Sequence, residues 1–231
     1  MVNGIGLMLS LLKQSLGQIV RELGARPAEV PGMFRKIRVK GMPFRVSRFV
    51  APQCCNVAVM EMNALVIQLF TIIITPFDKH APLVNVDIVR MLGKTEYLCA
   101  IYEFSGSHYA SFYEDIRCTG LKEVPVSENN WYSHLETFSK HFSKGAFQCG
   151  KEQYEHFIAE FIDRTCRIYR EADVLGAPGD NDARDCQIRH IRDYAHGLIE
   201  KGGVSTDAFK AAMSQEQLVD FYDTVLFRAE E

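Results

Sequence analysis

The sequence predicts an α+β fold, a single α/β/α sandwich in which a central antiparallel sheet is flanked by helices. Strand-like segments fill residues 34–104, and mainly helical segments follow at residues 106–231. Strands that come first and helices that come after are typical of this class. The connections between the strand-like segments are short, which favours antiparallel pairing over helical crossovers. Neither a long linker nor a repeat divides the 231 residues, so we expect one domain.

The first 30 residues are predicted to hold an amphipathic helix that packs on the core. Apolar side chains recur at helical spacing between Leu9 and Leu23. The apolar run from Ile5 to Leu12 is too short to span a bilayer and has no charged segment before it. We therefore expect no membrane contact and, without an evident transit peptide, a cytoplasmic location.

Six strands are predicted in the middle of the chain. Phe34–Lys40 alternates basic and apolar residues, and Phe44–Val50 repeats this pattern less strictly, as half-exposed strands do. The other four predicted strands are apolar runs at residues 56–62, 65–75, 84–91 and 96–104.

The rest of the chain is predicted to be helical, because apolar residues recur there at helical spacing. A turn at Gly176–Asp182 precedes one of these helices, and Gly202 and Gly203 end it. The predicted helices cover residues 108–116, 131–142, 151–170, 183–199, 205–212 and 215–227.

Positive charge is concentrated early in the chain, although the net charge of the whole chain is −3. Residues 1–60 carry nine basic and two acidic side chains, and residues 31–60 carry no acidic side chain. One interpretation is a solvated strand face. The other is a docking surface for an acidic partner or an anionic ligand, because complementary charge speeds encounter. A nucleic-acid partner is not expected, because the chain is acidic overall and has no DNA- or RNA-binding motif.

The seven cysteines form no CxxC pair, so the spacing needed for a zinc site or an iron–sulfur cluster is missing. Cys54 and Cys55 are adjacent, and the other cysteines are widely spread. Free thiols in a reducing cytosol are the simplest expectation.

The sequence also has no phosphate-binding loop, nucleophile elbow, HExxH motif, or nicotinamide or flavin fingerprint. We therefore expect no bound cofactor, and electrons for a redox reaction would have to come from another molecule. His134 and His141, like His190 and His196, lack the i,i+4 spacing of a helix-borne metal site. We expect surface or capping roles for these histidines and no metal site.

Two acidic residues, Glu61 and Asp87, lie inside predicted apolar strands. An unpaired buried charge is costly, so a carboxyl group in such surroundings must be hydrogen-bonded, protonated or paired. We expect Glu61 and Asp87 on neighbouring strands, where they could titrate as a coupled pair. They are the best candidates for proton chemistry. The alternatives are a capping role for Asp87 and a solvent-facing strand position for Glu61.

The order of several short motifs points to a known family. A Met-Glu-Met strand around Glu61 precedes a ten-residue apolar strand and a Pro-Leu-x-x-x-Asp-Ile-Val element that contains Asp87. A Lys-Glu-Val-Pro segment beginning at Lys122 and a helix opening at Trp131 come next, and the last helix runs into Val-Leu-Phe at residues 225–227. Over residues 44–231 this order resembles the ferredoxin-dependent bilin reductases and, through them, the red chlorophyll catabolite reductases.

The resemblance implies roles for six residues. Asp87 matches the proton-donating aspartate of the family, and Glu61 matches its active-site glutamate. Lys122 matches a basic residue that binds a propionate, and Trp131 matches a tryptophan of the substrate pocket. The two further substrate contacts, at positions where this chain departs from the family pattern, are Asn85 and Phe70.

The resemblance also implies an activity. The family reduces linear tetrapyrroles such as biliverdin by a radical mechanism, with single electrons from ferredoxin or flavodoxin and protons from side chains. An acidic ferredoxin-like donor would dock near the basic residues 35–48. The alternatives are a tetrapyrrole-binding protein without turnover and an unrelated α+β ligand-binding or interaction domain.

Overall fold

The computed structural model describes residues 4–64, 67–91, 94–102, 163–174, 181–202 and 206–228. Within these ranges, seven strands form one antiparallel sheet with the order β1-β3-β4-β5-β6-β7, and β2 pairs with β3. The strands are β1 (Arg26–Ala28), β2 (Lys36–Val39), β3 (Met42–Ala51), β4 (Cys55–Asn63), β5 (Ile67–Pro76), β6 (Leu83–Met91) and β7 (Lys94–Tyr102).

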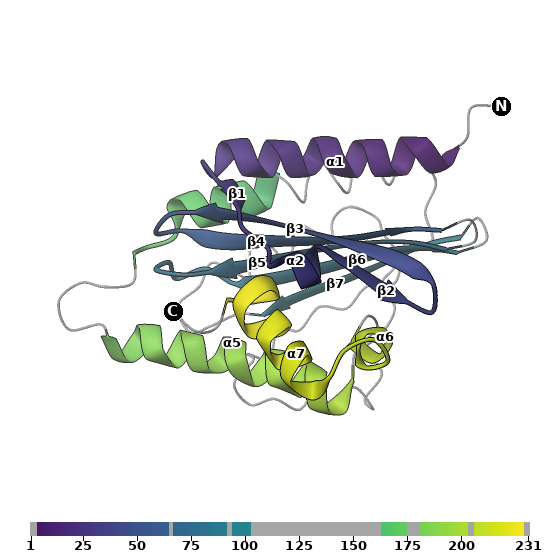
Figure 1. Ribbon diagram of the computed structural model, residues 1–231. Coiled ribbons are helices and arrows are strands. Elements are labelled where there is room, and N and C mark those ends of the chain that lie inside the picture. The colour runs from purple at the N-terminus through teal and green to yellow at the C-terminus, as the bar shows by residue number, and fades with distance from the viewer. Residues whose placement is uncertain are drawn as a thin grey trace.

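Helices cover both faces of this sheet, which confirms the predicted sandwich (Figure 1). One side, called here the α1 face, carries α1 (Gly4–Glu22) and the helix at residues 163–171. The opposite side, called the α5 face, carries the C-terminal helices (Figure 1). These are α5 (Asn181–Lys201), α6 (Thr206–Lys210), α7 (Gln215–Asp220) and a π-helix, η2 (Phe221–Leu226).

The core is divided in the same way, because successive side chains of a strand point to opposite faces. On the α1 face, Val57, Val59 and Ile72 pack with Ile19 of α1 and Tyr169. On the α5 face, the core contains residues of the same strands together with apolar residues of α5, α7 and η2: Ala58, Met60, Leu69, Ile73, Ile191, Leu198, Leu218 and Val225. Both faces of β4 and β5 are therefore buried, which explains their nearly continuous apolar sequence.

The main differences from the predicted elements lie near the start of the chain. The first helix ends at Glu22, because Gly24 follows with a positive φ of 65° that glycine adopts without strain. Residues 26–28 form the edge strand β1, which pairs with Phe49 and its neighbours instead of extending the helical region to residue 30. Phe34 belongs to the short helix α2 (Gly32–Arg35), so the predicted strand at Phe34–Lys40 is shortened to β2.

The other helices and strands predicted on described residues agree with the structure apart from small shifts of their ends. The helix predicted at 183–199 is α5, and Gly202 ends it with a φ of 96°. The helix predicted at 215–227 consists of α7 followed by the π-helix η2. The helices predicted at 108–116 and 131–142 lie outside the described residues. None of the described helices is long and apolar enough to cross a membrane.

Candidate functional site

Asp87 lies in the middle of β6, and its side chain is on the α5 face with only 7% exposure. β5 lies beside it and places Thr71 directly opposite, where the Thr71 hydroxyl donates a hydrogen bond to the Asp87 carboxyl group. Burial raises the pKa of Asp87 to about 6, and the hydrogen bond from Thr71 opposes this rise. An acid with a pKa near neutrality can both hold and release a proton at physiological pH.

Asn85 lies two residues before Asp87 on the same strand and therefore on the same face. Its amide nitrogen donates a hydrogen bond to the Tyr194 hydroxyl of α5 over 3.2 Å. The amide oxygen of Asn85 is buried and has no hydrogen-bond partner among the described residues. Buried polar atoms normally have a hydrogen-bond partner. A ligand that donates a hydrogen bond would supply the partner that this oxygen lacks.

The helices that cover this region contribute two hydroxyl groups that are hydrogen-bonded to each other. Tyr222 of η2 and Thr206 of α6 form a hydrogen bond of 2.6 Å between their side chains. Burial raises the pKa of the Tyr222 phenol, and the charge of Asp87 is among the further causes that raise it. Tyr222 and Asp87 therefore lie close enough to interact electrostatically across the boundary between helix and sheet.

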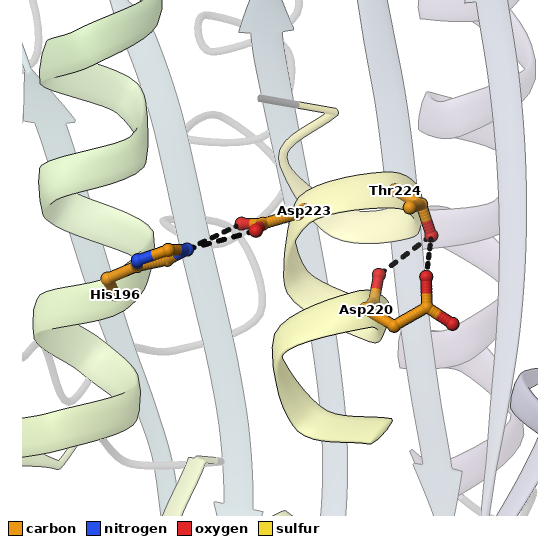
Figure 2. Close-up of polar contacts among 4 residues, drawn as sticks. All are labelled: His196, Asp220, Asp223 and Thr224. Atoms are coloured by element: carbon orange, nitrogen blue, oxygen red, sulfur yellow. Dashed lines mark hydrogen bonds and ion pairs between the residues drawn. The ribbon is translucent and has the colours of Figure 1, made fainter. Parts of the chain in front are cut away.

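The side chains of His196 of α5 and Asp223 of η2 are hydrogen-bonded to each other on the same face of the sheet (Figure 2). The histidine Nε2 lies 3.0 Å from each carboxylate oxygen. The Asp223 side chain is 7% exposed and the His196 side chain 38%, so the histidine is the partner that reaches solvent. π-helical turns such as η2 are rare and are often found at functional sites.

Glu61 does not lie beside Asp87, so the expected coupled pair is wrong. β5 separates the two strands, and the register aligns Glu61 with Phe70 but Asp87 with Thr71. Because neighbouring positions in β5 point to opposite faces, Glu61 is on the α1 face. There its carboxylate forms an ion pair of 3.4 Å with Lys13 of α1. A catalytic role for Glu61 stays a prediction, without Asp87 as its partner.

The register also places Phe70 on the face opposite Asp87, so its predicted substrate contact stays a prediction that does not belong to the Asp87 site. The side chain of Phe70 is 1% exposed and belongs to the core of the α1 face. Thr71 is the residue of β5 that faces Asp87, and Met60 is its counterpart in β4. The substrate contacts predicted for Lys122 and Trp131 lie outside the described residues and stay predictions.

Sequence reasoning missed the polar residues that the helices bring to this face: Tyr194, His196, Tyr222 and Asp223. His196 was expected to have a surface or capping role, yet it pairs with a buried carboxylate 27 positions away in the chain. No local spacing rule connects two residues in different helices. The available signal was the acidic residue in the apolar segment FYDTVL, since such an acid requires a partner.

In the part of the chain that the structure describes, no three His, Cys, Asp or Glu side chains are grouped in a way that could hold a metal ion. The polar groups of the α5 face can instead exchange protons and form hydrogen bonds. Asp87 offers an acid, Asn85 offers an unpaired acceptor, and two tyrosines offer hydroxyl groups from the helices.

Comparison with known proteins gives a structural likeness without a sequence match. No protein-family model matches the chain, and no curated protein matches it significantly. Among solved structures, the crystal structure of phytochromobilin synthase from tomato in complex with biliverdin is similar. The TM-score is 0.68 at 11% sequence identity, and the match covers 95% of this chain and 82% of that chain. The chain therefore shares the fold of a synthase whose crystal structure contains biliverdin.

Proposed function

We propose that this protein binds a linear tetrapyrrole against the α5 face of its sheet and reduces it with electrons from a ferredoxin or flavodoxin. The observation that carries the proposal is Asp87, a buried acid with a pKa of about 6 in a fold shared with phytochromobilin synthase. Reduction of one double bond consumes two electrons and two protons. Asp87 supplies one proton at the carbon that gains electron density, and solvent supplies the second proton.

The neighbours of Asp87 suit a tetrapyrrole as ligand. The unpaired amide oxygen of Asn85 can accept a hydrogen bond from a pyrrole N–H group. Tyr194 and Tyr222 are buried on the same face, and each places a hydroxyl group beside apolar ring atoms. We assign to Lys122 and Trp131 the roles that the family resemblance implies, which are a propionate contact and a place in the substrate pocket respectively.

The electron donor is proposed to dock on β2 and β3, where exposed basic side chains gather on the α1 face. Lys36 and Arg45 are exposed and lie directly opposite each other on paired strands. Arg45 also lies opposite Glu61 of β4 on its other side, so this surface is not purely basic. The exposed basic groups nevertheless supply the complementary charge that speeds encounter with a negatively charged partner. Arg38 and Lys40 are also exposed and extend this basic surface.

The test is spectroscopic. Biliverdin is added to the purified protein under anaerobic conditions, the absorption spectrum is recorded, and reduced ferredoxin is then supplied. Binding shifts and sharpens the spectrum, and reduction moves the main band to shorter wavelength as conjugation is lost. Lack of any shift with biliverdin or related linear tetrapyrroles would contradict the proposal.

The second candidate is a tetrapyrrole-binding protein without turnover. Thr71 and Met60, the residues in register with Asp87, carry no ionisable group, which favours this alternative over an enzyme with several acids on the sheet. A spectral shift on binding that stays unchanged after addition of reduced ferredoxin and reduced flavodoxin would support it.

A further inference from the structure

Two adjacent cysteines lie at one end of the sheet, outside the candidate site. Cys54 is the last residue of the turn between β3 and β4, and Cys55 is the first residue of β4. The carbonyl oxygen of Cys54 accepts a hydrogen bond of 2.9 Å from the Phe77 amide, which ties this turn to the segment after β5. Lys79 follows in that segment, and its ammonium group donates to the carbonyl oxygen of Ala172 over 2.8 Å.

The thiol groups of the two cysteines differ in their access to solvent. Cys55 has 0% exposure and packs in the core of the α1 face together with Cys166. Cys54 is partly exposed and packs against the margin of that core. The two side chains are hydrogen-bonded to each other. Cys54 is therefore the partly exposed member of the pair, and Cys55 is the enclosed member beside it.

The charges around the pair favour reaction at Cys54. The hydrogen bond from Cys55 lowers the pKa of the Cys54 thiol, burial opposes this effect, and the ammonium group of Lys79 lowers the pKa further. The same hydrogen bond and burial raise the pKa of Cys55. A thiolate is the nucleophilic form of cysteine, and it forms more readily beside a lysine.

We propose that Cys54 and Cys55 form a peroxide-sensitive thiol pair, in which Cys54 is oxidised first and Cys55 then closes a disulfide bond. This assignment does not depend on the proposed tetrapyrrole chemistry. It gives a function to an adjacent cysteine pair whose sequence alone indicated only free thiols.

The reaction balances with hydrogen peroxide as oxidant. The Cys54 thiolate attacks one peroxide oxygen, the O–O bond breaks, and the departing hydroxide takes up a proton to leave as water. The product is a sulfenic acid on Cys54. The Cys55 sulfur then attacks the Cys54 sulfur, the S–O bond breaks, and the oxygen leaves with two protons as a second water. Two thiols have lost two electrons and two protons, and the peroxide has gained them.

A disulfide between adjacent residues is easily reversed. The Cα atoms of neighbouring residues are about 3.8 Å apart, closer than the roughly 4.4–6.8 Å that disulfides usually span. Strained disulfides have higher reduction potentials and are the labile ones. A mild thiol reductant should therefore restore the pair, as a reversible modification requires.

Mass spectrometry of the full chain tests this assignment. The tryptic peptide of residues 49–79 contains Cys54 and Cys55 and no other cysteine, so their disulfide appears as the loss of two hydrogen atoms from that one peptide. After brief treatment with hydrogen peroxide, we expect this loss and its reversal by dithiothreitol. Linkage of this peptide to the one that contains Cys166, or an unchanged peptide, would overturn the proposal.

Two variants and an internal control sharpen the test. In Cys55→Ser, the Cys54 sulfenic acid has no partner and should accumulate as a dimedone adduct. In Cys54→Ser, peroxide should leave Cys55 unmodified. Cys186 of α5 is also partly exposed and lies 3.6 Å from His190 Nε2, so it serves as a stringent control that has a potential activating neighbour of its own. In the unaltered protein, we expect iodoacetamide to label Cys54 several-fold faster than Cys186, and equal or slower labelling of Cys54 would contradict its role as the first thiol to react.

Discussion

The two faces of the sheet hold their acidic residues in different ways. On the α1 face, Glu61 pairs with Lys13, and the two side chains are 23% and 58% exposed. On the α5 face, the carboxyl groups of Asp87 and Asp223 are almost completely enclosed. An acid near solvent keeps its hydration, whereas an enclosed acid must find a partner or retain its proton. The enclosed face is therefore the one suited to proton chemistry.

The largest expected difference between the faces is in catalysis. Asp87→Asn removes the proposed proton donor, so we expect bilin reduction to fall roughly 100- to 10,000-fold, the usual contribution of a general acid. Binding of biliverdin should persist, because the amide has nearly the same shape. Glu61→Gln is the matched variant on the α1 face and should retain reduction within a few-fold. The rate of the absorbance change after addition of reduced ferredoxin measures both variants.

These two variants can also contradict the assignment of proton chemistry to the α5 face. If Glu61→Gln were the variant that stopped reduction while Asp87→Asn remained active, the α1 face would hold the proton donor. Equal activity of both variants would leave the enclosed acid without a catalytic role, although the spectral shift on binding could remain.

The second effect is a dependence of stability on pH. The pKa of Asp87 is raised from 3.8 to about 6, so its contribution to stability is present below pH 3.8 and is lost as the pH rises through 6. A pKa difference of about 2 corresponds to roughly 3 kcal/mol. Asp87→Asn has no such ionisation. Its free energy of unfolding relative to the unaltered protein should therefore increase by roughly 3 kcal/mol across this pH range.

Urea unfolding at several pH values measures this difference. Parallel pH profiles for the unaltered protein and Asp87→Asn would show that burial of Asp87 does not disfavour its charged form.

The third effect compares the side-chain pairs of the two faces, which are His196 with Asp223 and Lys13 with Glu61. His196→Ala leaves the Asp223 carboxylate buried without its partner, and we expect a loss of about 1–3 kcal/mol in the free energy of unfolding. Lys13→Ala removes the more exposed pair with Glu61 and should cost no more than about 1 kcal/mol. Urea denaturation at neutral pH ranks the two variants. A larger loss for Lys13→Ala would show that the pair on the α1 face contributes more to stability than the pair on the α5 face, contrary to this reasoning.

The smallest expected effect concerns the glycines that end α1 and α5. Gly24 has a φ of 65°, and an added Cβ atom would meet no other atom within 4 Å, so Gly24→Ala should cost about 1 kcal/mol. Gly202 has a φ of 96°, and an added Cβ atom would lie 3.0 Å from a carboxylate oxygen of Asp207. We expect Gly202→Ala to cost about 2 kcal/mol for strain and crowding together. Thermal unfolding monitored by circular dichroism compares the two variants. A greater loss of stability for Gly24→Ala than for Gly202→Ala would contradict this reasoning.

The sequence predicted the sandwich but not which face each acid occupies. The alternation of apolar and polar residues reveals a strand's buried face only when the other face is polar. β4 and β5 are buried on both sides, so nothing local distinguishes the neighbours Met60 and Glu61, or Phe70 and Thr71. A shift of one residue exchanges the faces. Asp87 could be recognised from its apolar surroundings, whereas its partner Thr71 required the register.

The helical part of the site was beyond prediction for another reason. The His196–Asp223 pair joins α5 to η2, and the geometry depends on how these helices pack. Helical periodicity shows which side of each helix is apolar, but it does not show which residues of two helices meet. The π-helical form of residues 221–226 was also unpredictable, since such turns have no simple sequence signature.

Asn56, the residue after Cys55, connects an early strand of the sheet to the last helix of the α5 face. Its amide group donates to the carbonyl oxygens of Val225 and Leu226, which lie 169 and 170 positions later in the chain. A ribosome therefore delivers the whole sheet long before the π-helix that covers it. Until that helix docks, the Asp87 side of the nascent sheet lacks this cover, so its apolar surface is exposed longest to aggregation.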